Sequence, residues 1–301
     1  MEFKIEKLQT FTGHKSSVYG LAKGENSNVF YSVAGDGYVV RWDIDKPEEG
    51  IPLLKLINNA YTLKYVAERK LMIVPDNQLG VHWVDVDSKK IIHTTSLPGV
   101  SVFDIKISGD NVFLSDNKGS FYKISVSDFS ISNHSVQSQK SARAMTVLED
   151  TQEIAIGYSD CTIRIFDLNT FELKNILKGH DHSVFSVIYL PERKLLASAG
   201  RDAKLIFWNA AGNFELVEKI PAHIYPVNHL EILSDTGFLA SASMDKTIKI
   251  WDTDHLKLKK VIDRGRHQSH NSSVNRLLWL EGQQQLLSAS DDRNISLWNL
   301  F

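Results

Sequence analysis

Four sets of histidine, serine and aspartate recur along the sequence at constant spacing. In each set a Ser lies 18 residues after a His, an Asp lies 4 residues after the Ser, and a Trp lies 6 residues after the Asp. The sets are His14–Ser32–Asp36–Trp42, His180–Ser198–Asp202–Trp208, His223–Ser241–Asp245–Trp251 and His270–Ser288–Asp292–Trp298. These residue types perform nucleophilic acyl transfer when a His activates a Ser hydroxyl and an Asp orients the His.

The repetition of the sets favours a structural role over a catalytic one. A catalytic triad occurs once, in a cleft, whereas this set occurs four times and ends on a Trp each time. Within one set every polar group has a partner: the Asp accepts from the His, the His bonds the Ser hydroxyl, and the Ser accepts the indole N–H. We therefore predict four structural tetrads, no catalytic residue and a protein that is not an enzyme.

The tetrads lie within a longer repeat. The Trp positions, filled by Ile or Phe in two units, follow one another at steps of 41, 41, 42, 42, 43 and 47 residues. The seven units end near Trp42, Trp83, Ile124, Phe166, Trp208, Trp251 and Trp298. Alternating apolar and polar residues separated by turn signals predict strands, and four short strands fit one unit. Such a period is typical of β-propeller blades. We predict an all-β, seven-bladed β-propeller of four-stranded antiparallel blades, in a single domain spanning residues 1–301.

The chain also resembles the WD-repeat (WD40) family over essentially its whole length. The resemblance is carried by the tetrads, by Gly-His pairs that open units and by Trp-Asp pairs that close strands, such as Gly13-His14 and Trp42-Asp43. In that family the commonest partner site lies on the face near the channel mouth, five residues after the His. The resemblance implies these partner-binding residues on that top face: Tyr19, Tyr61, Phe103, Arg143, Phe185, Asn228 and Asn275, with Arg201 and Asp291 further out. Packing of the aromatic rings into the channel wall is the alternative reading.

Units 2, 3 and 4 depart from the tetrad pattern. The Ser is replaced by Ile73, Leu114 and Ile156, and the His is replaced by Leu56, Pro98 and Ser138. Replacing several members together converts a polar network into apolar packing, which can be neutral in stability. We expect these three units to form a contiguous arc packed by hydrophobes, and to be the specialised side of the propeller.

The two ends of the sequence complement each other. The chain ends directly after Trp298, whereas each earlier unit continues with a further strand. We expect residues 3–11 to supply the missing outer strand of blade 7, which leaves no gap in the ring.

The amino-acid composition limits the classes of partner and the cellular location that we expect. A net charge of -2 provides no global field for nucleic acid or an anionic membrane, and a lone Cys161 fits a reducing compartment. We predict a cytoplasmic protein with no cofactor, no metal and no membrane partner, monomeric by itself but able to act as a subunit of a larger complex. The extra length of the last unit, residues 263–270, is expected to be a solvated loop, with a basic contact for an acidic partner or a phosphate as the alternative.

The predicted function is a non-catalytic scaffold for protein–protein interaction, which binds a protein or peptide on the top face around the central channel. One alternative is an enzyme or small-ligand sensor with a site in the channel, because fold does not dictate function. A second alternative is a nucleic-acid-associated subunit whose aromatic residues stack bases, which the net charge disfavours.

Overall fold

The computed structural model describes residues 3–301, and within them every extended segment belongs to one of seven four-stranded sheets. The first three sheets in chain order comprise β2 (Val18–Lys23), β3 (Val29–Ala34), β4 (Tyr38–Asp43), β5 (Ile51–Lys55); β6 (Lys64–Val66), β7 (Leu71–Asp76), β8 (Gly80–Asp85), β9 (Lys90–Ser96); and β10 (Val102–Ser108), β11 (Asn111–Asp116), β12 (Ser120–Ser125), β13 (Ile131–Val136). The next three comprise β14 (Ala142–Leu148), β15 (Glu153–Tyr158), β16 (Thr162–Asp167), β17 (Leu173–Lys178); β18 (Val184–Leu190), β19 (Leu195–Gly200), β20 (Lys204–Asn209), β21 (Glu215–Pro221); and β22 (Val227–Leu233), β23 (Phe238–Ser243), β24 (Ile248–Asp252), β25 (Lys257–Ile262). The last comprises β1 (Glu6–Phe11), β26 (Val274–Leu280), β27 (Gln285–Ser290) and β28 (Ile295–Asn299). This is the predicted seven-bladed β-propeller, with each sheet forming one blade.

The chain divides into two compact units. Unit 1 consists of the described residues up to Ser101 together with Glu231–Phe301, and unit 2 consists of Val102–Leu230. Unit 2 holds the sheets β10–β13, β14–β17 and β18–β21, and the boundary between the units falls within β22.

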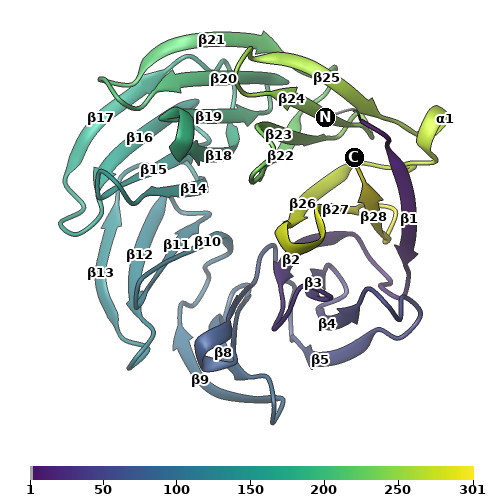
Figure 1. The fold of residues 1–301 in the computed structure, drawn as a ribbon. Helices are drawn as coiled ribbons and strands as arrows, with labels where there is room; N and C mark the ends of the chain where they lie inside the picture. The colour runs from purple at the N-terminus through teal and green to yellow at the C-terminus, as the bar shows by residue number, and fades with distance from the viewer. Residues whose placement is uncertain (1–2) are drawn as a thin grey trace. The chain divides into compact units, whose positions relative to one another are not determined.

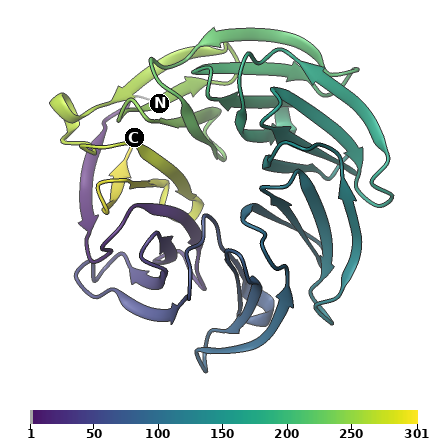
Figure 2. The same cartoon turned by 180° about the vertical axis from the view of Figure 1, so that it is seen from behind.

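Strand β1 completes the last blade, as predicted. It pairs antiparallel with β28, with Thr10 opposite Ser296 and Phe11 opposite Ile295, and the two strands lie side by side in both views (Figures 1 and 2). The buried Phe11 ring then packs edge-on against Phe30, with 4.9 Å between ring centroids. Residues from the two ends of the sequence thus build one sheet of unit 1.

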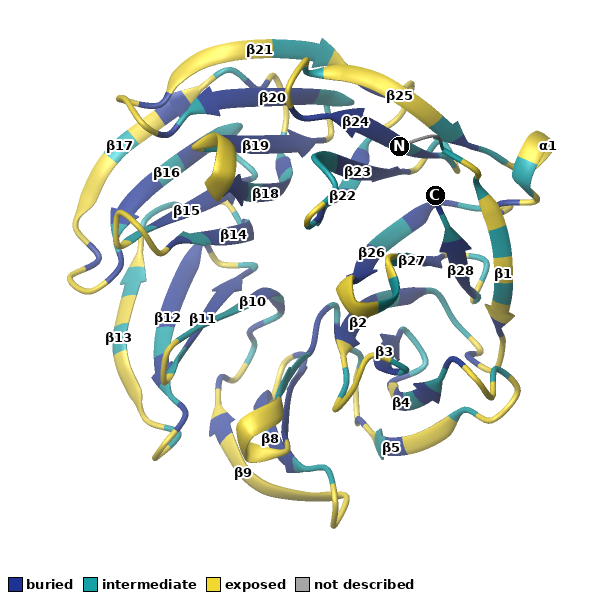
Figure 3. Ribbon diagram, viewed as in Figure 1, coloured by how far each residue is buried: buried dark blue, intermediate teal, exposed yellow. Residues whose placement is uncertain are grey.

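Burial follows the position of a strand within its sheet. The second strand of the first blade, β3, is buried at all six residues, whereas the outer strand β25 is exposed at its first four residues and buried only at Ile262. Figure 3 shows the same contrast between dark inner strands and exposed outer strands such as β9 and β13. Strands buried on both faces require continuous apolar runs, which is why the middle strands are rich in Val, Ile, Leu and Ala.

The register of blade 2 corrects the predicted repeat. In the other blades the Trp-position residue lies opposite the residue twelve before it, as Trp42 lies opposite Phe30. In blade 2 the residue with that pairing is Val84, opposite Met72, so Trp83 does not occupy the Trp position. A shift of one residue sends a side chain to the opposite face of a strand. Trp83 accordingly donates its indole N–H to Thr95 of β9 at 3.0 Å instead of to a serine of an inner strand.

The insertion at residues 263–270 contains a short helix rather than a loop alone. Helix α1 (Arg264–His267) begins after Asp263, whose carboxylate accepts the backbone N–H of Arg266 at 2.8 Å. Asp is a favoured residue at this capping position because its carboxylate satisfies an otherwise unpaired helix N–H.

Candidate functional site

The tetrads form the hydrogen-bond chains that their chemistry allows. In blade 5, His180 Nδ1 lies 2.9 Å from Asp202 Oδ2, and His180 Nε2 lies 2.8 Å from Ser198 Oγ. Trp208 Nε1 donates to the same Ser198 Oγ at 2.9 Å. Because a carboxylate only accepts, Nδ1 carries the proton, and Nε2 accepts from the serine hydroxyl. The tetrad therefore ties strands β19 and β20 to the loop before β18 and to the turn between β19 and β20.

The other tetrads have the same geometry where their bonds are described. His14 Nε2 and His270 Nε2 lie 2.7 and 2.8 Å from Ser32 and Ser288. Trp251 Nε1 donates to Ser241 at 2.8 Å. All four tetrad serines have no exposed surface, so a substrate carbonyl cannot reach any of these hydroxyls in the folded protein. The resemblance to a catalytic triad ends there.

Burial makes the His14 side chain sensitive to acid. Desolvation lowers the pKa of His14 below its usual value, and the attraction of Asp36 only partly offsets this. The unfolded chain then binds a proton more readily than the folded protein does, so stability is full above the usual His pKa and decreases as the pH falls through it.

We expect the midpoint of urea unfolding to decrease between about pH 7 and about pH 5. The slope of this decrease should be smaller in the His14→Gln variant, whose side chain does not titrate in that range. Urea titrations followed by tryptophan fluorescence at several pH values would measure it. An identical slope in both proteins would show that His14 does not contribute.

Blades 2, 3 and 4 have fully buried apolar residues at the serine position, as expected: Ile73, Leu114 and Ile156. They also contain polar networks, which the expectation of an arc packed by hydrophobes left out. In blade 3 the fully buried Asp116 accepts the Tyr122 hydroxyl at 3.0 Å and the Ser120 N–H at 2.8 Å. In blade 2 the fully buried Asp76 accepts the backbone N–H groups of Ile57 and Asn58 at 2.8 and 3.0 Å. In blade 2 the acid bonds the loop backbone directly, with His82 Nε2 3.6 Å from Asp76, and in blade 3 the acid bonds the hairpin that follows it. Neither blade has a histidine at the tetrad position.

In blade 4, Ser138 takes the place of the tetrad histidine and donates to Asp160 at 2.9 Å. Asp160 also accepts from the guanidinium of Arg164 at 2.7 Å. Burial alone would raise the pKa of Asp160, but the bonds from Thr162 and Ser138 and the charge of Arg164 outweigh it and lower that pKa. The inner part of this blade is apolar, with Ile156 and Phe166 fully buried. Only the middle of the blade therefore matches the expected apolar packing.

The proposed partner-binding positions share one backbone feature. In five blades the strand register shifts at this position, so that the residue is an extra one without a partner in the adjacent strand. The five residues are Tyr19, Phe103, Arg143, Phe185 and Asn275. Such β-bulges turn a side chain away from the regular alternation of the sheet. All seven proposed positions, with Tyr61 and Asn228, are of intermediate burial, neither packed away nor fully exposed.

In unit 2 three of these residues form a stack. The Arg143 guanidinium lies 4.3 Å from the Phe103 ring centroid and 4.9 Å from the Phe185 ring centroid. The three residues come from the inner strands β10, β14 and β18 of successive blades. Cation–π contacts on both sides restrain a side chain that would otherwise have many rotamers. We call these three residues the Phe–Arg–Phe stack.

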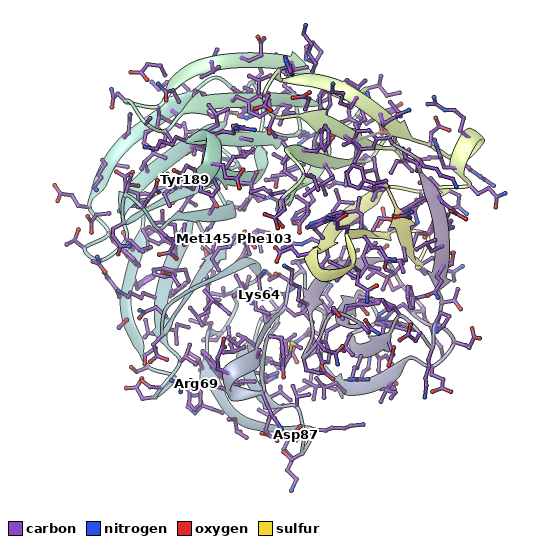
Figure 4. All side chains as sticks on the ribbon, viewed as in Figure 1. Lys64, Arg69, Asp87, Phe103, Met145 and Tyr189 are labelled. Atoms are coloured by element: carbon purple, nitrogen blue, oxygen red, sulfur yellow. The ribbon has the colours of Figure 1, made fainter. Side chains whose placement is uncertain are left out.

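A buried carboxylate supports the stack from below. Asp104, next to Phe103, accepts the backbone N–H of Met145 at 2.9 Å and so joins β10 to β14. Figure 4 shows Phe103 and Met145 close together on these strands. The stack therefore stands on backbone that a second, buried contact holds in place.

In unit 1 the corresponding residues form smaller contacts. Tyr19 and Tyr61 meet edge to face, with 5.4 Å between ring centroids. Asn275 donates to Asp291 at 2.7 Å and to the Val18 carbonyl at 3.1 Å. Of the two outer residues, both Arg201 and Asp291 are exposed.

Exposed apolar residues in the loops were missed by the sequence reasoning. Ile224 and Tyr225 follow a tetrad histidine and are 81% and 58% exposed, and Ile57 is 82% exposed. The position after the histidine is Lys15, Asp181 or Asn271 in the other tetrad blades. A comparison of the repeats at this position would have identified Ile224, because most surface loops carry polar residues there.

Together, seven four-stranded sheets, buried tetrads and bulged inner-strand residues define a repeat protein of the β-propeller class. The sequence profile described as "WD domain, G-beta repeat" matches residues 5–43, 171–209, 214–252 and 263–299, slightly more than half of the chain. The chain belongs to this WD-repeat family. Each of the four matches ends one residue beyond a tetrad tryptophan.

Several curated relatives align with the chain. It is 30% identical to "Nuclear distribution protein PAC1" of Arthroderma otae over 49% of this chain and 33% of that protein. It is 24% identical to the "66 kDa stress protein" of Physarum polycephalum over 97% of this chain and 48% of that protein. It is 23% identical to "Actin-interacting protein 1" of Caenorhabditis elegans over 96% of this chain and 47% of that protein. The chain thus spans half or less of the length of these relatives.

Two features are absent from the part of the chain that the structure describes. None of the helices in residues 3–301 has the length and apolar character that a membrane span requires. Across the same residues no three His, Cys, Asp or Glu side chains come together in a way that could hold a metal ion.

Proposed function

We propose that this protein is a non-catalytic scaffold that binds a protein or peptide partner over the Phe–Arg–Phe stack. The observation that carries the proposal is the restrained Arg143 between two half-buried Phe rings, each presented by a β-bulge. Aromatic residues and Arg dominate the binding energy of protein interfaces. A side chain that is already ordered loses little entropy on binding.

Two further observations support a protein partner. Ile224 and Tyr225 are adjacent and add exposed apolar surface to a loop of the same unit, and contiguous exposed apolar surface is typical of interaction sites. One relative, "Actin-interacting protein 1", is named for an interaction with another protein. The partner-binding residues proposed from the sequence lie in each unit separately: Phe103, Arg143, Phe185, Asn228 and Arg201 in unit 2, and Tyr19, Tyr61 and Asn275 in unit 1.

The proposal extends to domain organisation, location and oligomeric state. We propose that residues 1–301 act as one domain in the cytoplasm, monomeric by itself and able to join a larger complex. The single cysteine supports a reducing location, because structural disulfides are rare there.

The triple variant Phe103→Ala, Arg143→Ala, Phe185→Ala is expected to lose its partner. Each hot-spot truncation costs about 1–2 kcal/mol of binding, and each 1.4 kcal/mol corresponds to about tenfold in affinity. We expect isotope-ratio affinity capture from the native host to show the loss of at least one protein, and titration with the purified protein to show at least about a hundredfold weaker binding.

A matched control removes similar side chains from outer strands of the same unit. The variant Ile131→Ala, Ile176→Ala, Lys178→Ala changes two apolar residues and one basic residue, all of them exposed. It should recover every partner at wild-type level. Equal recovery of all partners by the stack variant and by this control would refute the proposed site.

A further inference from the structure

A pocket lies in unit 1, between strand β1, the insertion that carries α1, and the turn before β28. Its volume is about 380 Å³. The residues that line it include Lys7, Arg264, Ser269, Asp292 and Ser296. None of them belongs to the proposed partner-binding surface.

Two cations point to an anionic ligand. Lys7 Nζ donates to the Gln268 carbonyl at 3.2 Å and is half-buried. Burial lowers the pKa of Lys7, and the charge of Asp292 only partly offsets this, so an added anion would stabilise the ammonium form. Arg264 is exposed, and its guanidinium has no hydrogen-bond or ion-pair partner among residues 3–301.

Arg266 differs from Arg264 in having an acidic partner. Arg266 is in the same helix, and its Nε donates to Asp263 at 2.8 Å. The insertion therefore neutralises one arginine internally and leaves the other beside the pocket.

A buried hydroxyl group provides independent evidence. Ser269 is 6% exposed and Ser296 has no exposed surface, yet neither Oγ has a hydrogen-bond partner within the described part of the chain. Buried hydroxyl groups are normally paired, because an unpaired one loses the bonds it made to water. Both serines line the pocket. Ser269 keeps a little exposed surface, so its hydroxyl is the one that would donate to a ligand with acceptor oxygens, whereas Ser296 has no exposed surface, like the tetrad serines.

The acid in the pocket is already engaged by the protein. Asp292 accepts from His270 Nδ1 at 2.9 Å and from the N–H groups of Asn271 and Asn294 at 3.1 and 3.0 Å. Its side chain is 6% exposed. Asp292 therefore belongs to the blade 7 tetrad, where these three donors satisfy its oxygens, although its charge still acts on Lys7.

We propose that this pocket binds a phosphoryl group. A phosphate carries close to two negative charges and several strong acceptor oxygens in different directions. That combination matches two cations from separate elements together with the Ser269 hydroxyl. A carboxylate has one charge and two coplanar oxygens, and would leave part of this donor set unpaired.

The test uses the intact protein with three probes: inorganic phosphate, O-phosphoserine and acetate. Each is titrated at low and constant ionic strength while amide NMR signals are followed. We expect saturable shifts with phosphate, centred on Ser269, Asn271 and Asn294, and much weaker ones with acetate. Tighter binding of O-phosphoserine than of inorganic phosphate would identify a phosphomonoester as the source, and the reverse order would identify free phosphate.

Substitutions in and near the pocket test whether phosphate binds there. Arg264→Gln should weaken phosphate binding about tenfold, and Ser269→Ala should weaken it several-fold. Arg266→Gln removes the same charge from the same helix and should have little effect. Thermal melts verify that each variant is folded. The absence of saturable phosphate binding, or equal weakening by Arg264→Gln and Arg266→Gln, would overturn the proposal.

Discussion

Deletion of residues 1–11 is expected to leave the protein unfolded or aggregated. The deletion removes β1 and exposes the edge of β28, whose N–H and C=O groups would then be open to pairing with other chains. It also removes Phe11, which is 1% exposed and packs against Phe30 and Trp42. Loss of a buried Phe alone costs about 3–5 kcal/mol, a large part of the roughly 5–15 kcal/mol that stabilise a typical domain.

Circular dichroism melts and size-exclusion chromatography would measure this effect. The control is Leu8→Ser, since Leu8 is 41% exposed and its replacement keeps the whole strand. The control should melt within a few degrees of the wild type. A truncated chain that is monodisperse and melts as cooperatively as the intact one would show that β1 is dispensable.

Replacing the central serine of a tetrad is expected to destabilise the protein strongly. In Ser198→Ala, His180 Nε2 and Trp208 Nε1 both lose their bond to Ser198 Oγ in a fully buried site. Each unpaired buried group costs about 1–3 kcal/mol, so we expect a loss of about 3 kcal/mol in the free energy of unfolding. Urea titration of the wild type and the variant measures it.

Blade 4 suggests the control, because it has an apolar residue at the serine position and Phe166 at the tryptophan position. The double variant Ser198→Ala, Trp208→Phe lacks the indole N–H that the single variant leaves unpaired. It should be less destabilised than the sum of the two single variants, by about 1 kcal/mol. Strict additivity would show that the indole N–H does not depend on Ser198.

The regular part of the fold could be predicted because its signals lie within one repeat. Constant spacing identified the tetrads, and the missing strand after Trp298 indicated the pairing of β1 with β28. Trp83 was misassigned because the repeat was aligned on residue type, whereas the register that makes Val84 the counterpart depends on two strands at once.

The replacement networks could not be recognised from the tetrad spacing. Asp116 pairs with Tyr122 six residues later in its own hairpin, and Asp160 pairs with Arg164 four residues later. Polar residues at such short separations are common in turns, so the sequence did not distinguish them from solvated groups. Likewise the stacking of Arg143 on Phe103 and Phe185 depends on neighbouring blades and not on any local pattern.

The β-bulges at the inner strands allow partner binding and folding to depend on different residues. A bulged residue such as Phe103 or Arg143 has no partner residue in the adjacent strand and lies outside the fully buried core. Its side chain can therefore be exchanged at small cost to folding, while the adjacent Asp104 and the apolar strands remain under structural constraint. Duplicated copies of such a chain could acquire new partners through single substitutions at these positions and keep the same thermal stability.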